Sequence, residues 1–271
     1  MDYIYSIIYG LVQGLTEFIP VSSSGHLVIM HQIFDFDFVS SLSFDVMLHA
    51  GTLVALLIYF YKDIIKYIGA FFNSLLKWQV KEKPNQLIAW MILIGTLPAL
   101  VFGFFLEEIV ENSLRSPLLV GLMLILVGYL FILFEKRTKK IKLLSESSFK
   151  SALIIGFFQV LALIPGTSRS GIAILGGLSQ KLKRDQAARF AFLLAIPVTL
   201  GAVVKRSGRL LSSDLLTHEW VLMILAFLVA VIAGYLVIRF LLKFLKTHSL
   251  KVFAYYRFVL GIIILIYFLI N

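Results

Sequence analysis

The chain has 271 residues, of which 60% are hydrophobic and 15% are charged, and its mean hydropathy is +0.95. Soluble domains are about half apolar and about one quarter charged, so this composition excludes a soluble globular protein and indicates a polytopic membrane protein. The net charge of +10 does not predict nucleic-acid binding, because the Lys and Arg residues lie mostly in short loops between apolar runs.

The first apolar segment, 3–34, is interrupted at 13–26 by the sequence QGLTEFIPVSSSGH. Each half of the segment is shorter than the roughly 20 residues that a helix needs to cross a bilayer. Non-helical backbone at membrane depth is tolerated only where protein or water covers its polar groups. We therefore predict a re-entrant helix–turn–helix hairpin that enters and leaves the membrane on one side.

A second interrupted segment, 151–180, contains QVLALIPGTSRSG at 159–171 and predicts a second re-entrant hairpin. The stretch 64–78 is amphipathic and is expected to lie on the inner membrane surface, as a linker in preference to a partner site. Six other segments are apolar and long enough to span a bilayer: 41–61, 86–106, 117–134, 186–204, 219–242 and 252–270. The predicted fold is therefore an all-α polytopic membrane protein with six transmembrane helices and two hairpins.

The charges of the connecting loops predict the side of the membrane on which each loop lies, because inner loops are enriched in Lys and Arg. With six spans and two hairpins, three basic loops share the inner side, while an acidic loop at 107–111 and both termini lie outside. The outer loop at 205–209 is basic and runs against this trend. The basic residues of the inner loops are Lys62, Lys66, Lys77, Lys81 and Lys83, then Lys136, Arg137, Lys139, Lys140 and Lys142, and finally Lys243, Lys246 and Lys251.

An internal repeat relates the two interrupted segments at a constant offset. Gly10 falls on Gly156, and the other equivalent pairs are Gln13 and Gln159, Ser22 and Ser168, Ser24 and Ser170, Gly25 and Gly171, and Phe44 and Phe190. The predicted topology gives the hairpins opposite directions, so the two halves, 1–135 and 150–271, form an inverted repeat within one membrane domain. Such repeats place the binding site where their broken helices meet, and the two turns are expected to touch near the midplane.

Both motifs place hydroxyl groups and a glycine at the start of a helix, where free backbone N–H groups and the helix dipole favour an anion. Gly25 and Gly171 let the backbone approach a ligand closely. Arg169 adds a planar, permanently charged group that suits phosphate or carboxylate oxygens. Together these features predict an anionic ligand.

Glu17 lies one helical turn after Gln13, so both side chains point to one face. A carboxylate beside an anion is repulsive unless a cation lies between them, and Glu17 with the Gln13 amide oxygen would supply hard ligands for Mg²⁺ or Ca²⁺. His26 is close enough along the chain to act as an acid–base group, and a serine among 22–24 is a candidate nucleophile.

Each candidate also has a structural alternative. A serine in a membrane turn often bonds only to backbone, and a buried arginine such as Arg169 could form a structural ion pair with Glu17. His26 could be satisfied by a backbone carbonyl. Four residues near the span ends are interpreted as packing or interface residues instead of catalysts: Asp45, His49, Arg189 and Arg257.

The two motifs together resemble the signatures of the undecaprenyl-diphosphate phosphatase family of the bacitracin-resistance type. QGLTEFIPVSSSGH resembles an E/Q-x-x-x-E segment running into PxSSxGH, and PGTSRSG resembles PGxSRS. SFDVMLHAGTLVA from Ser43 and RFAFLLAIPVTLGA from Arg189 also resemble the family, so the resemblance covers essentially the whole chain. It implies a metal-assisted hydrolase of the bacterial plasma (inner) membrane that converts undecaprenyl diphosphate to the monophosphate and inorganic phosphate. The reaction would recycle the lipid carrier for cell-wall synthesis, with the active site on the external side.

The resemblance assigns a role to each motif residue. Glu17 and Gln13 would bind the metal and support activation, Ser23 would be the nucleophile and His26 its acid–base partner. Arg169 would clamp the diphosphate. The other residues expected to line the substrate site are Ser22, Ser24, Gly25, Gly166, Ser168 and Ser170.

Three positions depart from the family pattern. Gln13 stands where many members have glutamate, which removes one negative charge from the metal site. Ser24 stands where threonine is common and keeps the hydroxyl, whereas Ala173 stands where threonine often follows SRSG and lacks it.

A transporter is the alternative function, because inverted repeats with broken helices are also a transporter architecture. A lipid-phosphate flippase or an anion transporter would use Arg169 and the helix dipoles, but it would not require a hydroxyl, a histidine and a carboxylate on one turn. A structural scaffold would leave the intramembrane charges unexplained. The expected partners are a polyprenyl diphosphate lipid and membrane lipids, and the sequence leaves open whether the chain forms a homodimer.

Overall fold

The computed structural model describes residues 1–33, 42–114, 116–211 and 216–270, and within these ranges its regular structure is helical. The first half contains α1 (Asp2–Phe18), α2 (Ser23–Ile33), α3 (Leu42–Leu76), α4 (Pro84–Ser113) and α5 (Pro117–Arg137). The second half contains α6 (Phe149–Val160), α7 (Arg169–Ser179), α8 (Arg184–Leu211), α9 (Thr217–Phe244) and α10 (Lys251–Ile270). Two short 3₁₀ helices, η1 (Leu144–Glu146) and η2 (Leu161–Leu163), flank α6.

Six helices of the described ranges are long and apolar enough to cross a membrane, which confirms the predicted spans: α3, α4, α5, α8, α9 and α10. The other four, α1, α2, α6 and α7, have 17, 11, 12 and 11 residues. These four are shorter than the roughly 20 residues of a typical span. The chain is therefore a multi-pass helical membrane protein with two pairs of short helices.

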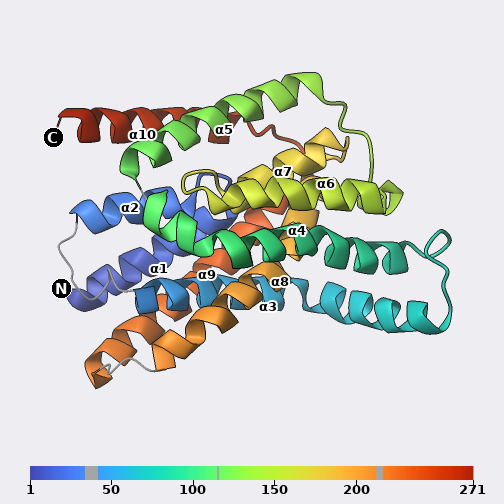
Figure 1. The fold of residues 1–271 in the computed structure, drawn as a ribbon, viewed down its shortest axis with the longest axis horizontal. Coiled ribbons are helices and arrows are strands. Elements are labelled where there is room, and N and C mark those ends of the chain that lie inside the picture. Colours follow the sequence, from blue (N-terminus) through green and yellow to red (C-terminus); the bar gives the residue numbers. More distant parts are fainter. Residues whose placement is uncertain (34–41, 115, 212–215, 271) are drawn as a thin grey trace.

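The short helices run in from opposite ends of the molecule (Figure 1). From the end that carries both chain termini, α1 runs inward and α2 runs back, whereas α6 and α7 do the same from the other end. Between these helices lie the first turn, residues 19–22, and the second turn, residues 164–168. Both turns are thus placed towards the middle of the molecule.

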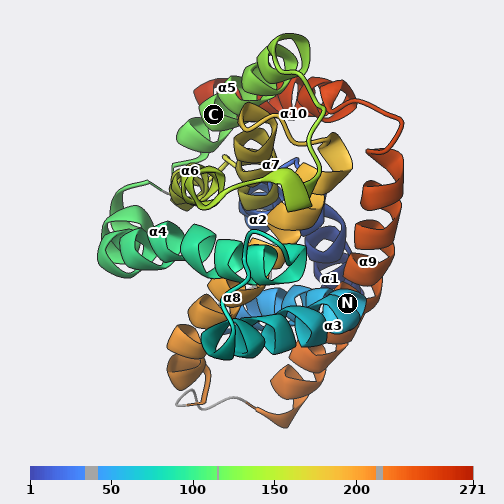
Figure 2. The ribbon, with the colours of Figure 1, turned by 90° about the vertical axis from the view of Figure 1, so that its right-hand side faces the viewer.

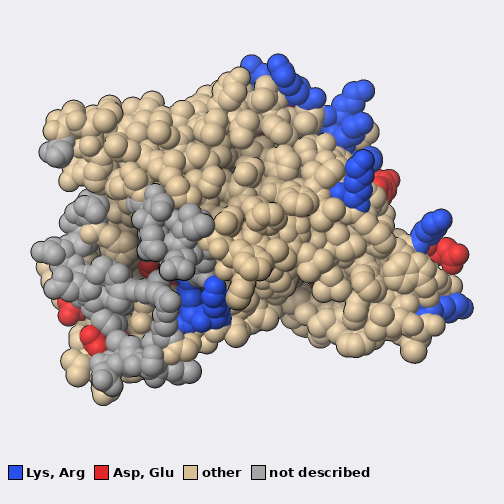
Figure 3. Space-filling model, in the orientation of Figure 1, with Lys and Arg blue, Asp and Glu red and all other residues tan. Residues whose placement is uncertain are grey.

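The three basic connections lie together, as the loop charges predict. The links from α3 to α4 and from α5 to α6 are at the end opposite both termini, and the link from α9 to α10 lies towards the same side but nearer the middle (Figure 1). On the face drawn in Figure 3, the Lys and Arg side chains gather mainly at that end. The side chains of the predicted acidic loop at 107–111, and that of Arg209, lie outside the part of the chain that the structure describes.

Each hairpin packs against a long helix of the other half of the chain. A Cβ atom on Gly10 of α1 would clash with the Ala226 carbonyl oxygen of α9. One on Gly156 of α6 would clash with the Gly95 carbonyl oxygen of α4. Because cores are close-packed, only glycine permits these two helix crossings. Gly10 and Gly156 therefore make equivalent contacts.

Helix α7 forms the centre of the core. Its residues from Ser170 to Leu178 are all buried, and the end-on view of Figure 2 shows the other helices around it. A helix that is apolar on all sides is enclosed by protein or by lipid, and the burial of these residues within the chain shows that protein encloses α7. Arg169, at the first position of α7, therefore begins a rigid and fully packed element.

A buried carboxylate joins three segments at the basic end. Glu135 of α5 accepts two hydrogen bonds from Arg184 of α8, both at 2.8 Å, and one from the Leu250 backbone N–H at 3.0 Å. Lys140 Nζ is 3.3 Å from Glu135 Oε2, and the Glu135 side chain is only 2% exposed. Bidentate pairing with both oxygens satisfied makes the burial of this charge tolerable. The contacts fix the starts of α8 and α10 relative to α5.

Helix α3 is longer than the predicted span. It continues through Leu76, and so includes most of the amphipathic stretch that we expected to lie as a separate segment on the membrane surface. The region has no proline, and Arg189 of α8 pairs with Asp63 at 2.6 Å while Trp90 Nε1 donates to Ser74 Oγ at 2.9 Å. These contacts hold the extension as continuous helix, and they give Arg189 the packing role expected of it.

Candidate active site

The two turns end alike, each with a serine at a positive φ angle. Ser22 and Ser168 both have positive φ angles, 75° and 72°, which cost a serine roughly 1–3 kcal/mol. Each hydroxyl accepts a hydrogen bond from the backbone N–H three residues on, that of Gly25 at 3.3 Å and that of Gly171 at 3.2 Å. These are N-terminal helix caps. They place the positive dipole ends of α2 and α7 at the middle of the molecule.

The turns contact each other directly. The Gly166 N–H donates to Ser24 Oγ at 3.4 Å. Arg257 of α10 is fully buried. It donates to the Pro20 carbonyl of the first turn at 3.2 Å. It also donates to two carbonyls of the second turn, those of Gly166 at 2.8 Å and Thr167 at 3.2 Å. Its guanidinium also donates to the carbonyls of Met123 and Leu124. A buried guanidinium that is satisfied by both turns fixes their relative position.

Glu17 is the centre of a polar cluster, which we call the Glu17 cluster: Gln13, Glu17, Ser23 and His49. Ser23 Oγ donates to Glu17 Oε2 at 2.7 Å, and Gln13 Nε2 donates to the same oxygen at 3.1 Å. His49 of α3 completes the cluster, with Nδ1 at 3.1 Å from Gln13 Nε2 and 3.7 Å from Glu17 Oε2. The short bond to Ser23 positions the Glu17 carboxylate to accept the hydroxyl proton.

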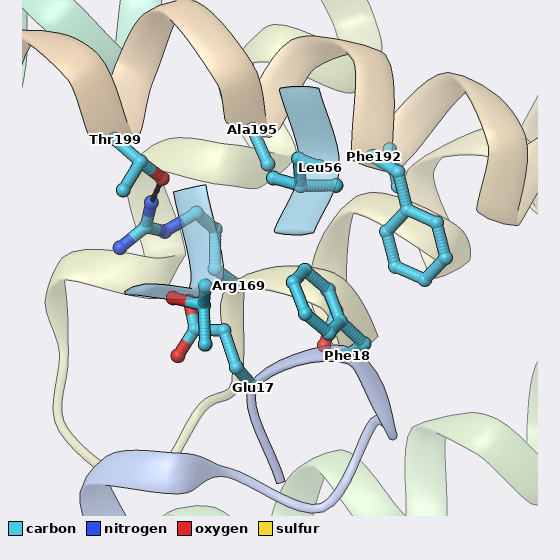
Figure 4. Close-up of a pocket in the computed structure, with 10 residues that line it drawn as sticks. Glu17, Phe18, Leu56, Arg169, Phe192, Ala195 and Thr199 are labelled. Atoms are coloured by element: carbon cyan, nitrogen blue, oxygen red, sulfur yellow. Dashed lines mark hydrogen bonds between the residues drawn. The ribbon is translucent and has the colours of Figure 1, made fainter. Parts of the chain in front are cut away.

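Arg169 lies beside this cluster. Arg169 and Glu17 line one narrow pocket, together with Thr199 of α8 (Figure 4). One guanidinium nitrogen donates to Thr199 Oγ1 at 2.5 Å. Among the residues that the structure describes, no ion pair within 4.0 Å joins Arg169 to Glu17. The structural ion pair considered as an alternative is thus not formed, and the guanidinium retains donors for an anion.

A larger cavity of about 600 Å³ adjoins the cluster, between α2, α3, α4 and α8. Ser24, His49 and Arg169 lie on its wall. Much of the remaining wall is apolar and comes from α4 and α8, for example from Ala99 and Ala202. A cavity with a polar side and an apolar wall suits an amphiphile with an anionic head group.

The hydroxyl-bearing residues divide into two groups. The hydroxyls of Ser22 and Ser168 accept backbone hydrogen bonds as helix caps. This matches the alternative in which such a serine bonds only to backbone. Ser24 and Ser170 contact these capping hydroxyls at 3.1 and 3.2 Å, and each also lines a cavity. Ser23 is the serine that contacts a carboxylate.

His26 lies apart from the Glu17 cluster. Its Nδ1 is 2.8 Å from the Ser22 carbonyl oxygen, and its Nε2 is 2.7 Å from the hydroxyl of Tyr256, on whose ring it stacks. In the described part of the chain, these contacts direct the ring towards α10, and none joins it to Glu17 or Ser23. The geometry matches the alternative in which a carbonyl satisfies His26.

Two residues of the site were missed by the sequence interpretation, which placed His49 among the packing residues and did not single out Thr199. His49 is an ionisable residue inside a predicted span, and such residues mark functional sites by default. That signal was present, but its partners Gln13 and Glu17 lie more than 30 residues away along the chain. Two other residues near the span ends keep structural roles. Arg257 bonds to the carbonyls of both turns, and the Asp45 carboxylate lies 3.8 Å from His31 Nε2.

The residues around Glu17 fit a divalent cation that is shared with a ligand. The described residues contain no group of three His, Cys, Asp or Glu side chains that could hold a metal. However, Gln13 is fully buried, and its Oε1 has no hydrogen-bond partner among the residues that the structure describes. Mg²⁺ is usually held by one or two carboxylates together with substrate phosphates. One carboxylate and one unsatisfied amide oxygen meet that requirement.

The fold and the site define a multi-pass helical membrane protein that gathers a serine, a carboxylate and an arginine where two short hairpins touch. The family model described as "Bacitracin resistance protein BacA" matches residues 6–263. The chain therefore belongs to the BacA family.

Curated relatives match over nearly the whole chain. The protein named undecaprenyl-diphosphatase from Rubrobacter xylanophilus is 39% identical over 265 residues, which cover 97% of each chain. Proteins of the same name from Thermodesulfovibrio yellowstonii and Prosthecochloris aestuarii are each 41% identical. The first of these alignments covers 100% of both chains, and the second covers 98% of this chain and 96% of its relative.

Proposed function

We infer that this protein hydrolyses undecaprenyl diphosphate to undecaprenyl phosphate and inorganic phosphate, and so recycles the lipid carrier of cell-wall synthesis. The inference is supported by the full-length similarity to relatives named undecaprenyl-diphosphatase. One structural observation supports the reaction chemistry. Ser23 is hydrogen-bonded to the Glu17 carboxylate, and Arg169 lies beside that carboxylate with guanidinium donors that are available for an anion.

In this mechanism Arg169 binds the non-bridging oxygens of the diphosphate, and the starts of α2 and α7 add their dipoles. Ser23 Oγ attacks the terminal phosphorus while its proton passes to Glu17. The bond between that phosphorus and the bridging oxygen breaks, and undecaprenyl phosphate leaves. Water then hydrolyses the phosphoserine to release inorganic phosphate and return the serine.

Glu17 and Gln13 would hold a divalent cation, Mg²⁺ or Ca²⁺, which when bound offsets the negative charge of the phosphates. His26 is one helical turn from Ser23, and it remains a candidate for proton transfer in the second step, in which water attacks. The apolar wall of the large cavity would take the first isoprenoid units of the lipid.

We propose that α1–α2 and α6–α7 are re-entrant hairpins of an inverted repeat within a single domain. The matched caps, the matched glycine crossings and the opposite directions of the hairpins support this architecture. The basic end would face the cytoplasm and the end with the termini the external side of the plasma membrane. The large cavity, on whose wall Ser24 and His49 lie, would then be reached from outside.

Purified protein in detergent tests the function directly. Wild-type protein should release inorganic phosphate from undecaprenyl diphosphate, and Arg169→Ala should lower that release at least about 100-fold, because one transition-state donor group is lost. Arg239→Ala, at an exposed position of α9, is the matched control and should retain wild-type turnover. Near-wild-type turnover in Arg169→Ala would contradict the assignment.

The same assay separates the enzyme from a transporter, because transport is undefined in detergent. Phosphate release without a sealed membrane is expected of a hydrolase only. A protein that binds the lipid but releases no phosphate in detergent would favour the flippase.

A further inference from the structure

Three donor groups from different parts of the chain meet at the Glu17 cluster. The Glu17 carboxylate and the Gln13 amide come from α1, and the His49 imidazole comes from α3. The amide terminus of Gln13 is 3.1 Å from each of the other two, and His49 Nδ1 is 3.7 Å from Glu17 Oε2. The family resemblance supplies roles for Glu17 and Gln13 but none for His49.

These separations are close to those between ligands of one cation. Two ligands that each lie about 2.1 Å from a metal are about 3.0 Å apart at a right angle and about 3.4 Å apart at the tetrahedral angle. The two 3.1 Å separations fall in this range. The third, at 3.7 Å, requires the side chains to close by only a few tenths of an ångström.

The protonation of His49 also suits a ligand. Gln13 Nε2 faces His49 Nδ1, and in this orientation of the amide the nitrogen donates and Nδ1 accepts. The Nδ1 lone pair therefore points into the cluster. Metals are bound by that lone pair of a neutral imidazole.

The second observation that supports a cation concerns the oxygen of the Gln13 amide. Its side chain is fully buried, and within the described part of the chain Oε1 has no hydrogen-bond partner while Nε2 makes two contacts. Amide oxygen and nitrogen are assigned from such contacts. A cation at the centre of the cluster would reverse the preference and draw the oxygen towards Glu17 and His49.

We propose that His49 is the third protein ligand of a divalent-cation site formed with Glu17 and Gln13. An imidazole nitrogen favours first-row transition cations, whereas Mg²⁺ and Ca²⁺ prefer all-oxygen sites. This chain should therefore bind Mn²⁺ more tightly than Mg²⁺ or Ca²⁺. The nitrogen ligand would add a donor to the site, although a neutral imidazole does not replace the negative charge that Gln13 lacks. The proposal rests on the proposed function only in that both involve a cation at Glu17.

Mn²⁺ binding to purified, metal-stripped protein tests the site without turnover. Electron paramagnetic resonance of bound Mn²⁺ should show coupling to one ¹⁴N nucleus, because the other two protein ligands are oxygens. Mn²⁺ should also remain bound in a severalfold excess of Mg²⁺. Absence of the ¹⁴N coupling, or of Mn²⁺ binding itself, in wild-type protein would overturn the proposal.

Two histidine variants make the test specific. His49→Gln should abolish the ¹⁴N coupling and weaken Mn²⁺ binding at least about tenfold, while Mg²⁺ binding changes less. His31→Gln is the matched control: His31 lines the same large cavity but contacts Tyr9 and Asp45, and this variant should keep the coupling. Coupling that persists in His49→Gln, or that is lost equally in both variants, would contradict the assignment.

The outcome is independent of catalysis. Ser23→Ala should keep the ¹⁴N coupling even when phosphate release is lost. If the wild-type protein bound Mn²⁺ through nitrogen yet hydrolysed no undecaprenyl diphosphate, the metal site would stand and the proposed function would fall. The reverse result, hydrolysis without nitrogen coupling, would remove His49 from the site and leave the function intact.

Discussion

The first and second turns end alike but are flanked by very different chemistry. Each ends in a serine that has a positive φ angle and caps the following helix, and a glycine stands three residues after that serine. At the repeat offset, however, Glu17 corresponds to Leu163, Ser23 to Arg169 and His26 to Ile172, as the printed sequence shows.

This difference makes the site asymmetric although the two turns end alike. The helix ends that flank the first turn carry Glu17 and Ser23, which move a proton and attack, and the helix start after the second turn carries Arg169, which binds an anion. Neither set of groups could catalyse the reaction alone. Ser23 needs a phosphate that is held in position, and Arg169, among the described residues, has no base beside it other than those near the first turn. The contact between the turns, through Gly166 and Ser24 and through Arg257, is therefore as important as any one side chain.

Replacing Glu17 by leucine, the residue type found at the equivalent position 163, should have the largest effect on activity. Glu17→Leu removes the group that accepts the Ser23 proton, and kcat should fall by about 10³-fold or more. Phosphate release from undecaprenyl diphosphate measures this loss. Leu163→Met, a volume-conserving change at the equivalent position of the second half, should cost little activity. Equal losses in the two variants would show that the carboxylate has no special role.

Ser23→Ala should be nearly as severe if Ser23 is the nucleophile, with a loss of about 10³-fold. Acid quenching of wild-type protein with substrate labelled in the terminal phosphate should trap a phosphoserine that is absent from the variant. Ser179→Ala is the control, because the Ser179 hydroxyl lies at the far end of α7 and bonds to the Gly176 carbonyl. Turnover within about tenfold of wild type in Ser23→Ala would favour direct attack by water.

Much of the architecture was predictable, because composition and apolar periodicity report directly on the bilayer. The six spans and the shared side of the three basic loops followed from length, hydropathy and charge. The continuous helix through 62–76 was not predicted, since the contacts that hold it come from Arg189 and Trp90 on other helices.

Within the site, the motifs identified Glu17, Ser23 and Arg169, because a carboxylate, a hydroxyl cluster and an arginine are conspicuous in apolar sequence. They could not place His49 in the cluster or turn His26 towards Tyr256. These outcomes depend on how helices α3 and α10 pack against the first hairpin. Such packing leaves no local pattern.

Arg257 tests whether the two turns behave as one unit. Arg257→Met would leave carbonyls of both turns without a donor inside the protein, and stability should fall by roughly 2–4 kcal/mol. Hydrogen exchange should then rise at 19–22 and at 164–168 together, and the melting temperature in detergent should drop. Faster exchange in only one turn would contradict the role of Arg257 as their common support.

The smallest effects are expected at the two capping serines. Ser22→Ala and Ser168→Ala each remove a cap but keep a Cβ in the left-handed region, so each should lower stability by about 1 kcal/mol. Ser→Gly loses the same hydroxyl but removes the strain of the positive φ angle, so it should cost less than Ser→Ala at both positions. Thermal unfolding in one detergent compares the four variants. A clear difference between the two turns in this ranking would contradict the prediction. It would show that turns with matching φ angles and hydrogen bonds contribute differently to stability.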